Sequence, residues 1–210
     1  PSGFKIISYS SNSVRAGWNA FPSSPQSDTA LLFRLEASTT TSFINIISSI
    51  TYDMAVSTLS IDTLDSNTSY YFRIGAFNMA GYPNYSYTLS TVTLSIPIHD
   101  STIEYIKTPR SITALFPNLP RNPEPLTSYG YSFEISTNNF FNVYLSSHTP
   151  DVDDNSLTIS GLRPNTTYYL RLATYNRMLV PNYSETRKEL TPLPQISPDV
   201  FVTYYSSNTV

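Results

Sequence analysis

Hydrophobic and polar residues alternate in short runs along most of the chain. Every second residue is apolar or small in six runs, namely 14–18, 33–37, 70–76, 112–116, 131–135 and 168–172. This period of two is typical of a β-strand with one buried face. Clusters of Pro, Ser and Asn separate the runs, no segment keeps a helical period, and the 16 prolines argue against long helices. The pattern predicts an all-β protein built from antiparallel sandwiches with six or seven short strands each.

The pattern repeats at a fixed offset. The segment Leu64–Asn78 reads LDSNTSYYFRIGAFN and Leu162–Asn176 reads LRPNTTYYLRLATYN, so Tyr70 corresponds to Tyr168 at an offset of 98 positions. The same offset pairs several further residues without a gap: Ser13 with Ser111, Ala16 with Ala114, Trp18 with Phe116, Pro22 with Pro120, Glu36 with Glu134, Phe43 with Phe141 and Leu59 with Leu157. A period of this length indicates tandem copies of one domain. We expect repeat 1 at 1–96 and repeat 2 at 97–196.

The last residues of the chain resemble the beginning of another copy. The segment Tyr205–Val210 matches Tyr9–Val14 at twice the offset. Residues 197–210 are therefore expected to be the start of a third repeat, its first strand, and the chain to be a piece of a longer array.

A Trp in the second strand precedes a Pro loop (Trp18, Pro22), and Leu-x-Pro-x-Thr-x-Tyr precedes the sixth strand (Leu162 to Tyr168). These two motifs resemble those of fibronectin type III domains. The first copy has Ser66 where the motif has Pro. The resemblance covers nearly the whole chain and implies two tandem antiparallel β-sandwiches of immunoglobulin-like topology, plus the first strand of a third.

The resemblance also assigns structural roles. A Tyr at the corner between the fifth and sixth strands buries its ring and bonds an upstream backbone group through its hydroxyl. We expect Tyr70 and Tyr168 to form these corners. We also expect Glu36 to pair with Arg73, and Glu134 with Arg171, across neighbouring strands at exposed sites. The predicted core and corner set is Tyr70, Tyr168, Leu64, Leu162, Trp18 and Phe116.

Composition limits the function classes. Charged residues make up only 13% of the chain, and the net charge is −3. Nothing in this balance favours nucleic acid or an anionic membrane as a partner. The chain has no cysteine and no apolar run long enough to span a bilayer. A Ser/Thr/Tyr-rich β protein without cysteine is compatible with a secreted bacterial surface protein.

Candidate catalytic chemistry is sparse. The two histidines, His99 and His148, do not recur between the copies or form part of a spaced motif. The sequence therefore predicts a non-enzymatic protein without a cofactor or metal. Asp151, Asp153 and Asp154 leave open a calcium site, which needs several oxygen ligands, against a solvated loop.

Two kinds of candidate surface site remain. Tyrosines follow the sixth strand and offer amphipathic rings for protein or glycan, although the recurrence of Pro-Asn-Tyr-Ser also suits a loop-closing role. These residues are Tyr82, Tyr85, Tyr87 and Tyr183. Four Asn-x-Ser/Thr sequons are candidate glycosylation sites, of which two occupy a tight turn that favours Asn for backbone reasons. They are Asn84, Asn182, Asn67 and Asn165.

The linkers predict a semi-rigid rod. Both are short and contain Pro but no Gly, and Ile96, Ile98, Leu193 and Ile196 are expected to pack against the flanking domains. The leading hypothesis is a structural segment of an extracellular stalk, cell-surface protein or filament. The alternatives are an adhesin or receptor-type binding module and a spacer attached to a secreted hydrolase. Neighbouring repeats or subunits are the expected partners, with strand addition through 197–210 as one mode.

Overall fold

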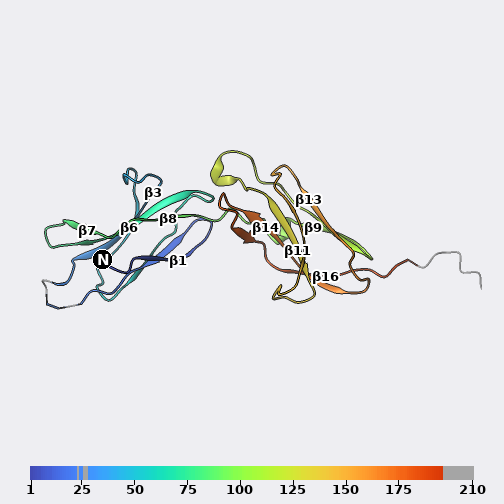
Figure 1. Cartoon of the computed structure of the whole chain (residues 1–210), viewed down its shortest axis with the longest axis horizontal. Helices are drawn as coiled ribbons and strands as arrows, with labels where there is room; N and C mark the ends of the chain where they lie inside the picture. Colours follow the sequence, from blue (N-terminus) through green and yellow to red (C-terminus); the bar gives the residue numbers. More distant parts are fainter. Residues whose placement is uncertain (23, 26–27, 196–210) are drawn as a thin grey trace, which may run out of the picture.

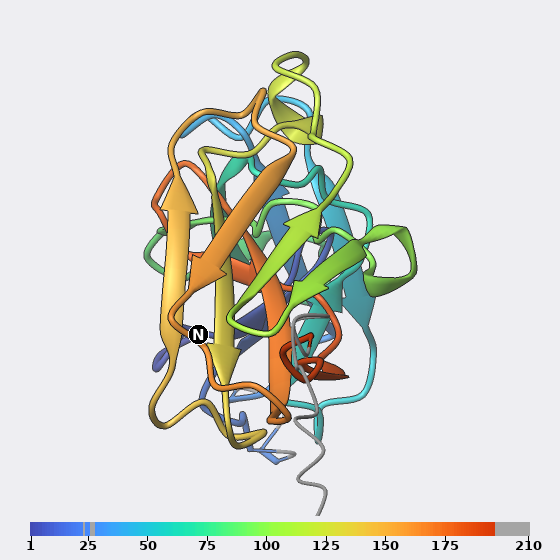
Figure 2. The ribbon, with the colours of Figure 1, turned by 90° about the vertical axis from the view of Figure 1, so that its right-hand side faces the viewer.

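The chain forms two β-sandwiches placed end to end. The computed structural model describes residues 1–22, 24–25 and 28–195. Figure 1 shows the first sandwich, in blue to green, beside the second, in yellow-green to red, along one long axis. Figure 2 looks along that axis, with the second sandwich in front. In the described part of the chain, no helix is long and apolar enough to cross a membrane.

The first sandwich pairs a three-stranded sheet with a five-stranded one, and all strand pairs are antiparallel. The smaller sheet has the order β1-β2-β5. The larger has the order β4-β3-β6-β7, with β8 also paired to β6. The strands are β1 (Lys5–Tyr9), β2 (Val14–Gly17), β3 (Leu32–Ser38), β4 (Ile47–Thr51), β5 (Thr58–Ile61), β6 (Ser69–Phe77), β7 (Pro83–Tyr85) and β8 (Leu89–Val92).

The second sandwich repeats this topology with sheets β13-β10-β9 and β12-β11-β14-β15, in which β16 also pairs with β14. Two 3₁₀ turns, η2 (Asp100–Thr102) and η3 (Glu124–Leu126), precede β9 and β11. The strands are β9 (Glu104–Thr108), β10 (Ser111–Leu115), β11 (Tyr131–Ser136), β12 (Leu145–Thr149), β13 (Ser156–Ser160), β14 (Thr167–Tyr175), β15 (Pro181–Tyr183) and β16 (Arg187–Leu190). The prediction of two tandem antiparallel sandwiches is confirmed.

A serine divides the last strand of each sandwich into two. Ser86 accepts a hydrogen bond from the Ile74 N–H through its hydroxyl (3.1 Å) and donates its own N–H to the Ile74 carbonyl (2.9 Å). Ser184 bonds Leu172 in the same way. The side chain thus replaces one backbone acceptor, which is why eight strands appear in each copy where the sequence predicted six or seven.

Each sandwich has its own core. The apolar faces of the alternating runs are buried between the two sheets, and Trp18 and Phe116 lie one residue beyond the second strands, with 5% and 4% of their surface exposed. Ile98, from the segment between the sandwiches, is buried in the second core. Leu193 is 66% exposed, so the expectation that it packs is wrong for the described chain. The predicted third-repeat strand at 197–210 and Ile196 lie outside the described residues.

Candidate functional site: the interdomain junction

The corner turn of the first sandwich meets the second sandwich through Asn67. This residue is fully buried and has a φ of 48°, a left-handed conformation that Asn tolerates better than most residues. Its Oδ1 accepts from the Arg177 N–H at 2.7 Å, and its Nδ2 donates to the Glu124 carbonyl at 3.3 Å. Ser66 donates its hydroxyl to the Pro125 carbonyl. One turn of the first sandwich therefore contacts two loops of the second.

Asparagines of the second sandwich reach back to the connecting segment. Asn176 is fully buried, and its Oδ1 accepts from Met178 (3.0 Å) and Val180 (2.9 Å) in its own loop. Its Nδ2 is thereby aimed at the Thr93 carbonyl, to which it donates at 3.1 Å. Asn182 donates its Nδ2 to the Ser95 carbonyl at 2.8 Å. The segment that follows β8 is therefore bonded to the second sandwich through the carbonyls of Thr93 and Ser95.

A buried pair of hydroxyls lies within this junction. Ser95 Oγ donates to Thr174 Oγ1 at 2.8 Å, and Thr174 donates to the Ile96 carbonyl at 2.9 Å. Both side chains are almost completely buried. Buried polar groups are costly unless they are hydrogen-bonded, so this network favours one relative placement of the two sandwiches.

The structure places the predicted corner residues inside the two cores. Tyr70 and Tyr168 are buried, and their hydroxyls accept from the Asp65 and Arg163 N–H groups, both at 3.0 Å. Burial raises the pKa of Tyr70 above its usual value. Leu64 and Leu162 are buried in the same cores. These residues anchor the junction turn and its copy to the two cores.

An aromatic–arginine stack covers the outer face of each larger sheet. The Arg73 guanidinium lies between the rings of Phe43 (3.9 Å) and Tyr85 (3.7 Å), and its Nε donates to Glu36 at 2.7 Å. Tyr85 also donates its hydroxyl to Glu36, at 2.9 Å. Glu36 is fully buried, so the expectation of an exposed pair is wrong there.

The second sandwich repeats the stack. Arg171 lies between Phe141 (4.0 Å) and Tyr183 (3.8 Å) and donates to Glu134 at 2.8 Å. Burial and the charge of Glu134 raise the pKa of Tyr183 to about 12. Tyr85 and Tyr183 lie in β7 and β15 and bond the sheet, so the structure separates them from Tyr82 and Tyr87, which are 73% and 59% exposed. The Tyr87 hydroxyl donates to the Phe4 carbonyl.

The four sequons divide into two groups. Asn67 uses the amide nitrogen that a glycan would modify to bond the second sandwich, and Asn182 uses its own to bond the connecting segment. Their copies, Asn165 and Asn84, are exposed, and Asn165 keeps the left-handed turn with a φ of 49°. The junction therefore competes with modification at two of the four positions.

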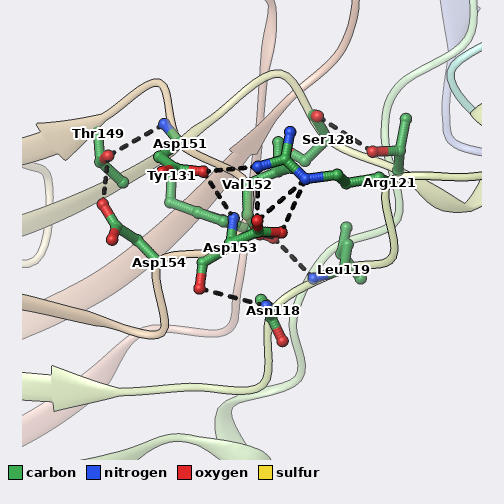
Figure 3. Close-up of polar contacts among 11 residues, drawn as sticks. Asn118, Leu119, Arg121, Ser128, Tyr131, Thr149, Asp151, Val152, Asp153 and Asp154 are labelled. Atoms are coloured by element: carbon green, nitrogen blue, oxygen red, sulfur yellow. Dashed lines mark hydrogen bonds and ion pairs between the residues drawn. The ribbon is translucent and has the colours of Figure 1, made fainter.

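The acidic cluster is held by an arginine (Figure 3). Arg121 Nη2 lies 2.5 Å from Asp153 Oδ2 and 3.2 Å from Asp151 Oδ1, while Asp154 accepts from the Thr149 hydroxyl at 2.5 Å. Across the residues that the structure describes, no group of three His, Cys, Asp or Glu side chains is arranged to hold a metal ion. The guanidinium supplies the charge that a cation would bring, so the cluster acts as a tie between two loops.

The sequence did not reveal the junction residues as a site. Asn176 and Asn182 belong to repeated motifs, but repetition alone does not distinguish a loop-capping Asn from one that contacts a neighbour. Phe43 and Phe141 occupy equivalent positions in the two copies, and both have a positive φ, 54° and 52°. In the sequence, the sign of their shared role was the recurrence of Phe at this position in both copies.

Comparison with solved structures identifies the fold. A two-domain fibronectin type III segment from chicken tenascin matches 92% of this chain and 99% of its own, with a TM-score of 0.50 and 13% identity. The FN1–FN3 domains of chicken CNTN1 match 92% of this chain and 67% of theirs, with a TM-score of 0.42 and 13% identity. No family model matches the chain. The chain is a tandem pair of domains with the fibronectin type III fold.

One curated protein shares part of the sequence. Tyrosine-protein phosphatase Lar-like from Caenorhabditis elegans is 31% identical over 146 residues, which is 66% of this chain. The chain spans only 6% of the length of that relative.

Proposed function

We propose that this chain is a non-enzymatic structural segment of an extracellular or cell-surface array, in which the junction holds consecutive sandwiches in a fixed orientation. The likeness to a tenascin segment and the partial identity with Lar-like support a place in such a multidomain protein. Phosphatase activity is not carried over, because the shared region is a small part of that relative.

The junction is the observation that carries the proposal. The connecting segment is bonded to the second sandwich through Thr93, Ser95 and Ile96, and Asn67 adds bonds from the corner turn. A flexible linker would leave these groups to water. Here a bend at the junction would break several buried hydrogen bonds together, each worth about 0.5–1.5 kcal/mol. A stiff junction of this kind suits a spacer that holds its flanking domains at a fixed distance and orientation.

The repeat supplies matched variants for the test. Asn67→Ala and Asn182→Ala remove junction bonds, whereas Asn165→Ala and Asn84→Ala change the same positions where no neighbour is bonded. We expect ¹⁵N relaxation to give one common tumbling tensor for both sandwiches in the parent chain and in the two control variants. The junction variants should give two separable correlation times. Independent tumbling of the sandwiches in the parent chain would refute the proposal.

A second candidate function is a binding module for protein or glycan. Tyr52 and Tyr82 are 71% and 73% exposed, and a hollow of about 460 Å³ lined by Leu31, Tyr52 and Met79 lies at the free end of the first sandwich. Rigid exposed tyrosines suit sugar or protein contacts. A glycan array and a pull-down with Tyr82→Ala and Tyr87→Ala test this function. Specific binding that both variants abolish would favour it over the structural role, and absence of binding by the parent chain would refute it.

A further inference from the structure

The two outer ends of the sandwich pair carry residues equivalent to the two halves of the junction. At the offset of 98, the leading end of the first sandwich has Asn78 and Asn84 where the junction has Asn176 and Asn182. The trailing end of the second sandwich has Asn165 and Thr191 where the junction has Asn67 and Thr93. We call these two surfaces, defined by those residues, the leading and trailing ends.

The junction bonds for which the two ends carry the same groups are those between an Asn side chain and a backbone group. In the junction these are Asn176 to the Thr93 carbonyl, Asn182 to the Ser95 carbonyl and the Arg177 N–H to Asn67. Backbone groups do not depend on residue type, so Met79 in place of Arg177 still offers its N–H. The Thr191 carbonyl already accepts from the backbone N–H of Asn165 at 3.1 Å, and its second lone pair can accept from another donor.

The leading end is already shaped for this contact. Asn78 Oδ1 accepts from the Ala80 and Tyr82 N–H groups, both at 3.0 Å, as Asn176 does in its own loop. This bonding fixes the Asn78 side chain with its Nδ2 as the remaining donor. Asn78 and Asn84 are exposed, whereas Asn176 is fully buried in the junction. The same groups are thus pre-positioned but uncovered.

Two positions that are polar in the junction are apolar at the equivalent places of the outer ends. Ser95 and Thr174, which bond each other, correspond to Leu193 and Ala76. Both members change together, so neither end would bury an unmatched hydroxyl. Leu193 is 66% exposed, and a hollow of about 310 Å³ lined by Ala76, Asn78 and Asn84 lies at the leading end. Burial of the Leu193 side chain in this hollow, against Ala76, would remove apolar surface from water.

We propose that the leading and trailing ends are complementary docking faces, so that a second copy of this chain stacks on the first head to tail. Asn78 and Asn84 of one copy bond the carbonyls of Thr191 and Leu193 in the other, Asn165 accepts from Met79, and Leu193 enters the hollow. This inference rests on the proposed structural function and names its partner. Because the two sandwiches lie along one long axis (Figure 1), repetition of a like head-to-tail contact would extend the array into a rod.

A fusion protein tests the proposal without depending on weak association in solution. Residues 1–196 are followed directly by the complete chain, which keeps the 98-residue period across the new boundary. Hydrogen exchange is measured at the Met79 N–H of both copies. Met79 of the second copy faces the trailing end of the first, and Met79 of the first copy faces solvent and serves as the internal control. We expect exchange about tenfold slower in the second copy.

Variants at the trailing end sharpen the result. Leu193→Asp and Asn165→Ala in the first copy should return the second-copy Met79 to the exchange rate of the control, whereas the same changes in the second copy should have no effect. Equal exchange at both Met79 positions in the parent fusion overturns the inference. The Arg177 N–H separates the two proposals: if it is protected in both copies while Met79 is not, head-to-tail docking fails and the stiff junction stands.

Discussion

The two sandwiches fill the same core position with different pairs of aromatic residues. In the first, Trp18 lies against Phe33 with ring centroids 5.1 Å apart. In the second, Phe116 lies against Tyr131 at 5.0 Å, in a similarly tilted arrangement. The larger ring of Trp18 faces Phe33 in the first copy, whereas the smaller ring of Phe116 faces Tyr131 at the equivalent positions of the second copy. The pair, rather than either residue, is what the fold requires.

The hydroxyl of Tyr131 explains how the smaller ring is tolerated. It accepts from the Leu119 N–H at 2.7 Å and donates to the Val152 carbonyl at 3.2 Å. The second core therefore replaces part of the apolar contact of an indole with two hydrogen bonds to flanking loops. Close packing of interiors makes such paired exchanges tolerable when each single change is not.

Truncation of the indole should give the largest effect. Trp18→Ala is expected to destabilise the first sandwich by about 3–5 kcal/mol, because a large cavity opens in a close-packed core. Calorimetry and amide exchange would show the loss in residues 1–92, with the second sandwich retaining its own stability. A loss of only about 0.5 kcal/mol, the level of ordinary surface substitutions, would contradict the assigned core role.

A double-mutant cycle sharpens the same comparison. Trp18→Phe and Phe33→Tyr together install the pair of the second sandwich in the first. We expect the double variant to be more stable than the sum of the single effects implies, with a coupling of about 0.5–3 kcal/mol. Strict additivity would show that the two positions adapt separately.

The buried glutamates differ in their number of charged partners. Glu36 contacts both Arg34, at 2.5 Å, and Arg73, at 2.7 Å, whereas Glu134 contacts Arg171 alone because Ser132 occupies the position of Arg34. Glu36→Gln should therefore cost about 2–3 kcal/mol, and Glu134→Gln about 1–2 kcal/mol. Denaturant unfolding of each sandwich, followed by site-resolved NMR, measures both values. Equal losses would show that Arg34 adds nothing.

The fold could be predicted from the sequence because its determinants are periodic and local. Alternation placed the strands, and the gapless offset showed that one sandwich is made twice. The corner residues Tyr70 and Tyr168 follow a motif of fixed spacing. The burial of Glu36 could not be predicted in this way, because it depends on Phe43 and Tyr85 folding over Arg73 from separate loops and strands.

The junction was harder to predict for the same physical reason. Asn67 and Asn165 have nearly identical local sequences and backbone angles, yet only Asn67 is buried. The difference arises from the neighbouring sandwich, which local sequence does not encode. The bonds between the sandwiches join residues far apart in the chain, from 57 positions for Asn67 and Glu124 to 110 positions for Asn67 and Arg177.

The two tyrosine corners should respond alike. Tyr70→Phe and Tyr168→Phe each leave one N–H without its acceptor, and both bonds are 3.0 Å long, so each is expected to cost about 0.5–1.5 kcal/mol. Tyr71→Phe and Tyr169→Phe, on the opposite faces of the same strands, are the matched controls and should cost less. A large effect in only one corner would show that the copies are not equivalent at this position.

The smallest expected effect is a loss of stability at alkaline pH. It concerns Tyr183, whose ring stacks on the Arg171 guanidinium in the second sandwich. Burial and the Glu134 charge raise the pKa of Tyr183 to about 12, from roughly 10 in the unfolded chain. The folded state thus holds this proton more tightly, so the associated stability is fully present below pH 10 and is lost as the pH rises through about 12. The difference in absorbance at the tyrosinate band between the parent and Tyr183→Phe should show one ionisation near pH 12. A midpoint near 10 would mean that Tyr183 is hydrated and that the stack over Arg171 is open in solution. A midpoint near pH 12 requires the Tyr183 hydroxyl to stay bonded to Glu134 in the folded sheet.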